Sequence, residues 1–435
     1  MASTPPAQPA VQDGTRGAAA TAASAPPRRS AAALVAVLSA LTALAPLSID
    51  MYVPGFPALG KTLGASSSTV QLTMTAFLVG LVVGQLLIGP LSDSLGRRRL
   101  LILGTAAFIL FSLLAAAAPN IALLIGARLL QGIASAAGMV LARAVLTDCF
   151  QGAELPRYFA VLSQVVAVAP IAAPVFGGAI LAVSTWRAVF VVLALVGGLL
   201  LLAVARAVPE SLPPERRQNS GLASAFLTMG TLLGRRAFMG YVLVIALVSA
   251  SLFAYVGGSS FVFENVHGVS STTYSLIFAT NAGGMLIAGA VFSRLAGRGM
   301  RLNSLLVIGL GVSALGALGQ VLLVVSGGES LVGTWVTLFV TVSGIGMVFP
   351  AGMSISQAVG RGTPGSASAL LGGLQFLFGA LASPLVGLFG EDSSLPMALV
   401  MLGGIVVAVL ALVGLARPWE GHGEVDDPRY SETSA

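Results

Sequence analysis

The chain has 435 residues, of which 56% are hydrophobic and only 9% are charged. A soluble domain carries roughly 25% charged residues, so this composition excludes a soluble globular protein. The formal net charge is +6, from 22 Lys and Arg against 16 Asp and Glu. We attribute this excess to membrane topology and expect no nucleic-acid partner, because the basic residues gather in segments between apolar stretches.

Twelve apolar stretches follow one another along the chain, each near the roughly 20 residues that a membrane-spanning helix needs. The apolar runs are continuous and do not alternate, which favours helices over a barrel. The predicted fold class is therefore an all-α integral membrane protein with twelve transmembrane helices. The expected spans are approximately 32–54, 68–91, 100–118, 121–144, 158–182, 188–206, 238–260, 273–294, 304–325, 332–354, 365–389 and 395–416.

The basic residues also predict the orientation in the membrane. Three of the 22 Lys and Arg lie elsewhere, Lys61 and Arg187 in loops of one side and Arg128 inside a span, which leaves 19 on the other side. The positive-inside rule makes the side with 19 basic residues cytoplasmic. Both termini are then expected in the cytoplasm.

A long polar segment divides the twelve spans into two sets of six. Two short residue patterns recur after 200 and 210 residues, at equivalent places in each set, so we expect two six-helix pseudo-repeats around a central site. The predicted organisation is a disordered cytoplasmic tail at 1–30, bundles at 31–206 and 237–416, a cytoplasmic loop at 207–236 and a cytoplasmic tail at 417–435. The recurring residues are Gly89, Leu95 and Arg98 with Gly289, Leu295 and Arg298, and Pro174 and Gly177 with Pro384 and Gly387.

Asp50 lies about twenty residues into the first stretch and is the only carboxylate that these spans place well inside the membrane. A charge near mid-bilayer costs at least ~3 kcal/mol and usually marks an ion or substrate path. Arg128 is expected at a similar depth in the fourth span, where the two side chains pair or share waters. Burial disfavours a charged carboxyl and a nearby arginine favours it, so Asp50 is a candidate proton carrier. The alternative is a static ion pair between the two spans.

Uncharged polar side chains inside spans are candidates for lining a substrate site, and each has interhelical hydrogen bonding as its alternative. No metal site or cofactor is expected, because the two histidines lie in a loop and a tail without a second ligand at metal spacing. An enzyme is not expected either, since the spans hold no cluster of acid, base and nucleophile. The candidate lining residues are Tyr52, Gln131, Gln164, Asn281 and Gln375.

The loop between spans two and three reads GPLSDSLGRRRLL, residues 89–101. Gly89 is expected to permit close helix packing, and Asp93 precedes Arg97 by one helical turn. This loop resembles motif A of the major facilitator superfamily, which implies that it helps to hold the outward-facing state through contacts between the halves. The alternative is a basic loop that only sets topology. The matching residues are Gly89, Leu91, Asp93, Gly96, Arg97, Arg98 and Leu101.

Further segments resemble the Bcr/CflA family of bicyclomycin/chloramphenicol-type drug:proton antiporters, among them PLSIDMYVPGFPAL at 46–59, RLLQGIASAAGMVLARAVLTD at 128–148 and APIAAPVFGG at 169–178. The resemblance implies the major facilitator fold and a role for Arg128 in proton transfer. It also implies an antiporter motif C, although Ala173 replaces the first glycine of that motif. The residues that match motif C are Pro170, Pro174, Gly177 and Gly178.

The expected function is therefore proton-coupled export of small amphipathic drugs, phenicol- or bicyclomycin-like, across the bacterial inner membrane by alternating access. The alternatives are an exporter of an endogenous metabolite and a facilitator without proton coupling. One intramembrane carboxylate allows about one proton per cycle, so we expect neutral, zwitterionic or at most monocationic substrates. The expected partners are this substrate, protons and the lipid bilayer, and the expected oligomeric state is a monomer.

Overall fold

The computed structural model describes residues 28–150, 154–217, 229–360, 364–388 and 393–424. These residues are helical with turns and loops, and no β-strand occurs among them. Twelve helices are long and apolar enough to cross a membrane. The predicted fold class, an all-α membrane protein with twelve spanning helices, is confirmed.

The first six spans begin with a helix that is interrupted near its far end. The helix α1 (Arg28–Asp50) is followed by a 3-10 turn, η1 (Val53–Gly55), and a short helix, α2 (Phe56–Leu63). The remaining helices of this half are α3 (Ser67–Leu95), α4 (Arg97–Ala116), α5 (Ile121–Cys149), α6 (Glu154–Val183) and α7 (Trp186–Ala207).

The second six spans begin with α9 (Arg236–Phe261), which continues into a π-helical turn, η3 (Val262–Val266). Short 3-10 turns, η2 (Pro214–Arg216) and η5 (Pro418–Glu420), follow the last helix of each half. The other helices are α10 (Ser271–Gly297), α11 (Leu302–Val325), α12 (Leu331–Val359), α13 (Pro364–Leu388) and α14 (Leu395–Ala411), which ends in a π-helical turn, η4 (Leu412–Ala416).

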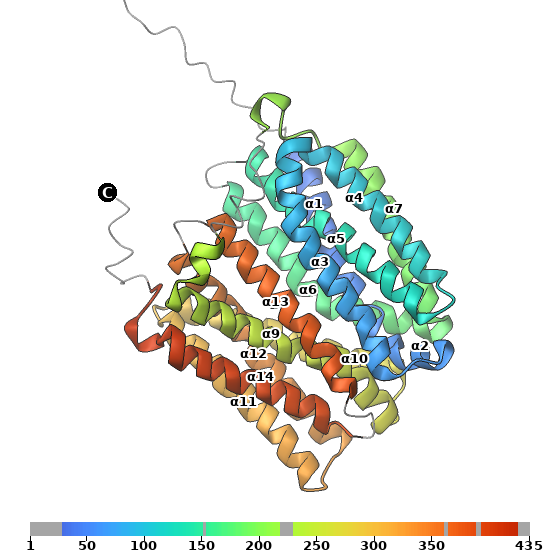
Figure 1. Ribbon diagram of the computed structural model, residues 1–435, viewed down its shortest axis with the longest axis vertical. Coiled ribbons are helices and arrows are strands. Elements are labelled where there is room, and N and C mark those ends of the chain that lie inside the picture. The colour runs from blue at the N-terminus through green and yellow to red at the C-terminus, as the bar shows by residue number, and fades with distance from the viewer. Residues whose placement is uncertain (1–27, 151–153, 218–228, 361–363, 389–392, 425–435) are drawn as a thin grey trace, which may run out of the picture.

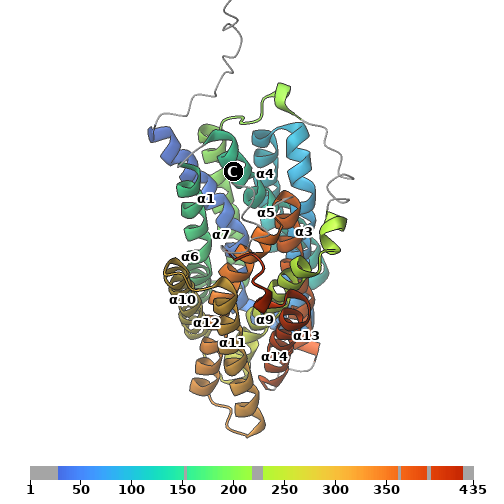
Figure 2. The same cartoon turned by 90° about the vertical axis from the view of Figure 1, so that its left-hand side faces the viewer.

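The two sets of helices form two bundles that lie side by side (Figure 1), and the turned view separates them into an upper and a lower half (Figure 2). Within the first bundle α5 packs against α3 and α4, and within the second α12 packs against α10 and α11. The halves meet along two lines, α3 with α13 and α6 with α10. One hydrophobic cluster belongs to the second half alone, whereas the other contains residues of both halves.

The same capping device occurs once in each half. Glu210, shortly after α7, accepts a hydrogen bond from the amide of Arg97 at the first position of α4, 2.9 Å away. Glu424, shortly after η4, accepts from the amides of Leu302 and Asn303 at the start of α11, at 3.1 and 2.8 Å. A carboxylate at a helix N-terminus is stabilised by the free amides and the helix dipole. In each half, an acidic residue that follows the sixth span therefore caps the N-terminus of the third span.

The predicted division into tails, two bundles and a loop stays a prediction. The helix α1 begins at Arg28, inside the predicted tail at 1–30, and the candidate span begins at Ala31. The rest of that tail, residues 1–27, lies outside the described residues, as do 218–228 of the loop between the halves and 425–435 of the C-terminal tail.

Candidate functional site

The break after α1 places Asp50 at the last position of this helix. Pro54 has no N–H to donate to the Asp50 carbonyl four residues earlier, so the helix cannot continue past this point. The chain turns instead, with the Gly55 amide donating to the Tyr52 carbonyl at 2.9 Å. Asp50 is 6% exposed, and its carboxyl makes no hydrogen bond or ion pair with a described residue.

Arg128 on α5 is fully buried and has its own partners. Its guanidinium donates to the Gln131 side-chain oxygen at 2.6 Å and to the Ser48 carbonyl at 3.0 Å. The guanidinium carbon lies 4.3 Å from the centre of the Tyr52 ring and 4.2 Å from that of Phe77, which is cation–π geometry. Aromatic faces and a carbonyl therefore hold this charge within the first half.

The structure brings Asp50 and Arg128 to one region but does not pair them directly. Arg128 bonds the backbone of Ser48, two residues before Asp50, yet no ion pair joins the two side chains. The expected direct ion pair between Asp50 and Arg128 is absent from this state. The Arg128 guanidinium donates instead to the Ser48 carbonyl and to the Gln131 side chain. Asp50 thus remains a buried acid without a fixed counter-charge.

Two of the predicted lining residues support Arg128 from inside the first half. Gln131 is fully buried and donates to the Ser112 hydroxyl on α4 at 2.8 Å while it accepts from Arg128. The Tyr52 hydroxyl lies 2.9 Å from the Thr73 hydroxyl on α3. In this state both side chains join helices of the first half.

The segment that follows Asp50 contacts the second half. The turn η1 contacts both α9 and α10. Asp50 lies within range of Coulombic interaction with Tyr255 on α9 and Tyr274 on α10. The amide of Asn281 donates to the Tyr255 hydroxyl at 3.0 Å, and its carbonyl oxygen is buried without a hydrogen-bond partner. Asn281 is therefore the predicted lining residue that bonds to a tyrosine of this network, and it keeps an unused acceptor.

The other two predicted lining residues lie outside this cluster. Gln164 is exposed on α6 and Gln375 is half-buried on α13, and neither makes a hydrogen bond to a described residue. Both belong to helices that line the contact between the halves. Their role in binding a substrate stays a prediction.

The motif C glycines allow α6 to pack closely against the chain after α1 and against α10 of the second half. A Cβ at Gly177 would lie 1.9 Å from the Met51 carbonyl oxygen, and one at Gly178 would lie 2.3 Å from the Ser275 hydroxyl on α10. Pro170 and Pro174 lie within the same helix and interrupt its hydrogen bonding. Gly177 thus supports the chain directly after Asp50, and Gly178 allows contact with the second half.

Pro384 in the second half corresponds to Pro174 and leaves a carbonyl free to accept a hydrogen bond from the first half. Pro384 has no N–H for the Ala380 carbonyl, and the Thr75 hydroxyl on α3 donates to that carbonyl at 2.9 Å. Gln71 bridges further, donating to the Gly257 carbonyl and accepting from the Gly387 amide, both at 3.0 Å. These bonds close the halves against each other at the end that carries α2, which we call the α2 end.

Motif A lies at the opposite end, where its contacts stay within the first half. Arg97 pairs with Asp93 at 2.7 Å and with Asp148 at the end of α5 at 3.3 Å. Arg98 donates to the Ala205 carbonyl at 2.8 Å, and Gly96 adopts a φ of 95° that favours glycine. None of the described hydrogen bonds or ion pairs of these residues reaches the second half.

One expectation for motif A is wrong. A Cβ at Gly89 would meet no other atom within 4 Å, so this glycine does not permit a close helix contact in this state. The close approaches along α3 occur instead at Gly80 and Gly84, which pack against α5.

Sequence reasoning missed Glu264. The seventh span was expected to end near residue 260, but the π-helical turn extends it to Val266 and includes this carboxylate. The signal for it is that apolar residues continue to Phe263 and that Val266 follows Glu264 by two residues, in FVFENV. No group of three or more metal-ligating side chains occurs in the part of the chain that the structure describes.

Comparison with known proteins places the chain in a family. Residues 38–383 match the Major Facilitator Superfamily. The chain is 40% identical to the "Uncharacterized MFS-type transporter YdgK" of Bacillus subtilis strain 168, covering 90% of this chain and 97% of that protein. It is 29% identical to the "Bicyclomycin resistance protein homolog" of Haemophilus influenzae, covering 87% and 94%, and 30% identical to the "Chloramphenicol resistance protein" of Pseudomonas aeruginosa, covering 91% and 94%.

A solved structure has the same fold. It is that of a bacterial homologue of the human lysosomal transporter Spinster, with a TM-score of 0.69 and 16% identity, covering 89% of this chain and 96% of that one. Proteins of this superfamily are transporters and not enzymes. The chain is a multi-pass membrane transporter that belongs to the major facilitator superfamily, in the Bcr/CflA family of bicyclomycin/chloramphenicol-type drug antiporters.

Proposed function

We propose that this transporter exchanges protons for small amphipathic compounds, phenicol- or bicyclomycin-like, and exports them across the bacterial inner membrane. Both termini lie in the cytoplasm in this proposal, and the monomer is the working unit. The resistance names of two relatives support the choice of substrate class. The basic residues of the loops and tails support the orientation.

The observation that carries the proposal is the state of Asp50. It is a buried acid at the junction of the halves, without a hydrogen bond or ion pair to a described residue. A buried carboxylate in this position costs free energy unless it binds a proton or a cation. Coupling between proton and substrate movement requires a carboxylate that binds a proton in one state of the transporter and releases it in another. Asp50 meets this requirement in our proposal.

The contacts between the halves support alternating access. In the proposed orientation the α2 end faces outward, where Thr75 and Gln71 hold α3 to α9 and α13. At the cytoplasmic end none of the described hydrogen bonds or ion pairs of the motif A residues reaches the second half. We therefore assign this conformation to the stage of the cycle in which the outer end is closed and substrate loads from the cytoplasm.

A susceptibility experiment tests the proposal. A bacterial host without its own major exporters expresses the wild type, Asp50→Asn or the control Glu329→Gln at matched membrane levels. Chloramphenicol is the neutral probe, norfloxacin the zwitterion and ethidium the monocation. We expect protection by the wild type and the control and none by Asp50→Asn.

Two other outcomes would redirect the proposal. Protection that survives in Asp50→Asn would contradict the role of this carboxyl and favour facilitated diffusion. Protection by none of the three proteins would contradict drug export and favour a narrower, endogenous substrate.

A further inference from the structure

The outer end of α9 holds a second carboxylate on an irregular turn. The His267 amide donates to the Val262 carbonyl at 3.1 Å, five residues back, which is the π-helical pattern. A π-turn inserts an extra residue into a helix and frequently marks a functional site. Here it carries Glu264, which the contacts described so far do not use.

Glu264 is half-buried and only partly satisfied. One carboxyl oxygen accepts a hydrogen bond from the Ser271 hydroxyl at 2.8 Å. The other oxygen is buried and has no hydrogen-bond partner. An unsatisfied buried carboxylate oxygen is costly, and a proton on it or a water beside it removes that cost.

The charged and titratable groups around Glu264 come from three elements. Lys61 on α2 interacts with it electrostatically from the first half. Tyr274 on α10 interacts with Glu264 and also with Asp50. His267 follows on the same segment, but its ring nitrogen lies 3.2 Å from the Thr334 hydroxyl, and burial lowers its pKa although Glu329 opposes the shift. His267 is therefore neutral near pH 7, and Glu264 is the group that can exchange a proton there.

Tyr274 interacts electrostatically with both carboxyls. It is fully buried, and its hydroxyl lies 2.8 Å from that of Ser259 on α9. This hydroxyl pair is therefore the candidate connection between the two acids. Hydroxyl groups both donate and accept, so they can pass a proton between acids that do not touch.

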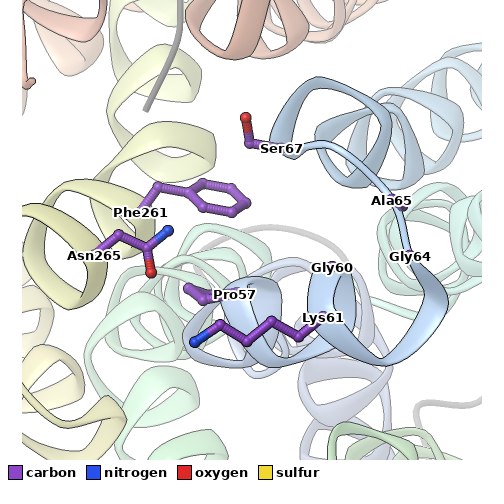
Figure 3. A pocket seen from close by; sticks show the side chains of 8 residues that line it. All are labelled: Pro57, Gly60, Lys61, Gly64, Ala65, Ser67, Phe261 and Asn265. Carbon is purple, nitrogen blue, oxygen red and sulfur yellow. The ribbon is translucent and has the colours of Figure 1, made fainter. Parts of the chain in front are cut away.

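A cavity at the α2 end lies beside the turn that carries Glu264. Phe261 and Asn265, three residues before and one residue after the acid, line this cavity of about 300 Å³ together with Lys61, Pro57 and Ser67. Figure 3 shows the Lys61 ammonium and the Asn265 side chain extending into the same opening, from opposite halves. The outer solution thus approaches to within one residue of Glu264 along the chain.

We propose that Glu264 is the outer proton-carrying carboxyl of this transporter, which takes a proton from water in the cavity and passes it toward Asp50. The inference rests on the proposed proton coupling. The proton leaves a hydronium ion, protonates the Glu264 carboxylate, and then moves through the hydroxyls and intervening water to the Asp50 carboxylate. Glu264 returns to its charged form, which Lys61 stabilises until the next proton arrives.

The test uses the purified full chain in proteoliposomes that contain a pH-sensitive dye. A chloramphenicol gradient drives proton movement, and chloramphenicol counterflow measures exchange that needs no net proton transfer. We expect Glu264→Gln to slow proton movement roughly tenfold, less than the hundredfold or more that a positioned acid–base group contributes in catalysis, because water replaces part of its function. Counterflow should stay at the wild-type level.

Three matched variants separate a relay from a structural contact. Glu264→Asp should recover most of the proton movement, and Glu329→Gln, at the same end of the second half, should behave as wild type. Lys61→Gln should keep proton movement within about twofold, because the cation does not carry the proton.

Two results would overturn this role for Glu264. Equal loss of counterflow and proton movement in Glu264→Gln and Lys61→Gln would assign the pair to holding the halves together. Wild-type proton movement in Glu264→Gln would remove Glu264 from the path while leaving the proposed function intact. A wild-type protein that moves no protons with chloramphenicol would overturn the proposed function, and this inference with it.

Discussion

The two halves of the transporter differ in where they bury charge. Among the described residues, the buried charged side chains are Asp50 and Arg128, and both belong to the first half. In the described part of the second half, the buried polar side chains are serines, threonines, two asparagines and one glutamine, and none of them is charged. The first half therefore holds the buried charges, whereas the second half presents neutral hydrogen-bonding groups to them and keeps its own acid, Glu264, half-buried at the α2 end.

This difference does not come from the scaffold. Both halves cap their third span with a distant glutamate, Glu210 in the first and Glu424 in the second. Both also carry a proline followed three residues later by a glycine in the fifth span, as Pro174 with Gly177 and Pro384 with Gly387. A repeated fold thus carries unequal chemistry, which is determined by a few side chains.

Replacing Arg128 should break the charged half most severely. Arg128→Lys keeps the charge but loses the planar group that stacks on Tyr52 and Phe77 and donates to two acceptors. We expect transport to fall about tenfold or more and unfolding in detergent to become easier by ~2 kcal/mol, since Gln131 and Ser48 lose a donor. Chloramphenicol transport and thermal unfolding measure the two effects. Full activity would mean that only the charge matters.

Replacing Asn281 should change substrate binding by the second half and leave proton coupling intact. Asn281→Ala removes the donor to Tyr255 and the unused buried acceptor. We expect the KM for chloramphenicol to rise several-fold, about the effect of one lost hydrogen bond, while proton movement per transported molecule stays unchanged. Loss of proton movement in this variant would show that the pair of Asn281 and Tyr255 takes part in proton transfer to Asp50.

Replacing Thr75 should have the smallest effect, on the balance between conformations. Thr75→Val removes the hydroxyl that donates to the Ala380 carbonyl. An interhelical hydrogen bond in a membrane protein contributes ~1 kcal/mol, so closure of the α2 end should weaken about fivefold.

Spin labels at Leu63→Cys and Ser326→Cys, in a Cys149→Ser background, report the distance across the α2 end. Thr62→Val is the matched control, because the Thr62 hydroxyl donates to Ala58 within its own helix. An unchanged distance distribution in Thr75→Val would mean that packing alone closes this end.

Much of this arrangement can be predicted from the sequence. Twelve apolar runs define the spans, and the cost of an intramembrane charge identifies Asp50 and Arg128 as buried functional residues. The absence of a direct ion pair between these two could not be predicted, because it depends on which acceptors surround the guanidinium. Glu264 was missed because the seventh span was expected to end near residue 260. Hydrophobic periodicity does not indicate a π-helical turn such as the one that extends this span. The bond from Thr75 to Ala380 joins residues 305 positions apart, which one sequence does not reveal.

The central claim is that Asp50 carries the proton that substrate displaces. The most direct test measures proton release when chloramphenicol binds to the purified transporter in weakly buffered detergent solution. By linkage, the wild type should release about one proton per bound molecule near neutral pH, and Asp50→Asn should bind chloramphenicol and release none. Equal proton release by Asp50→Asn and the wild type would contradict the account.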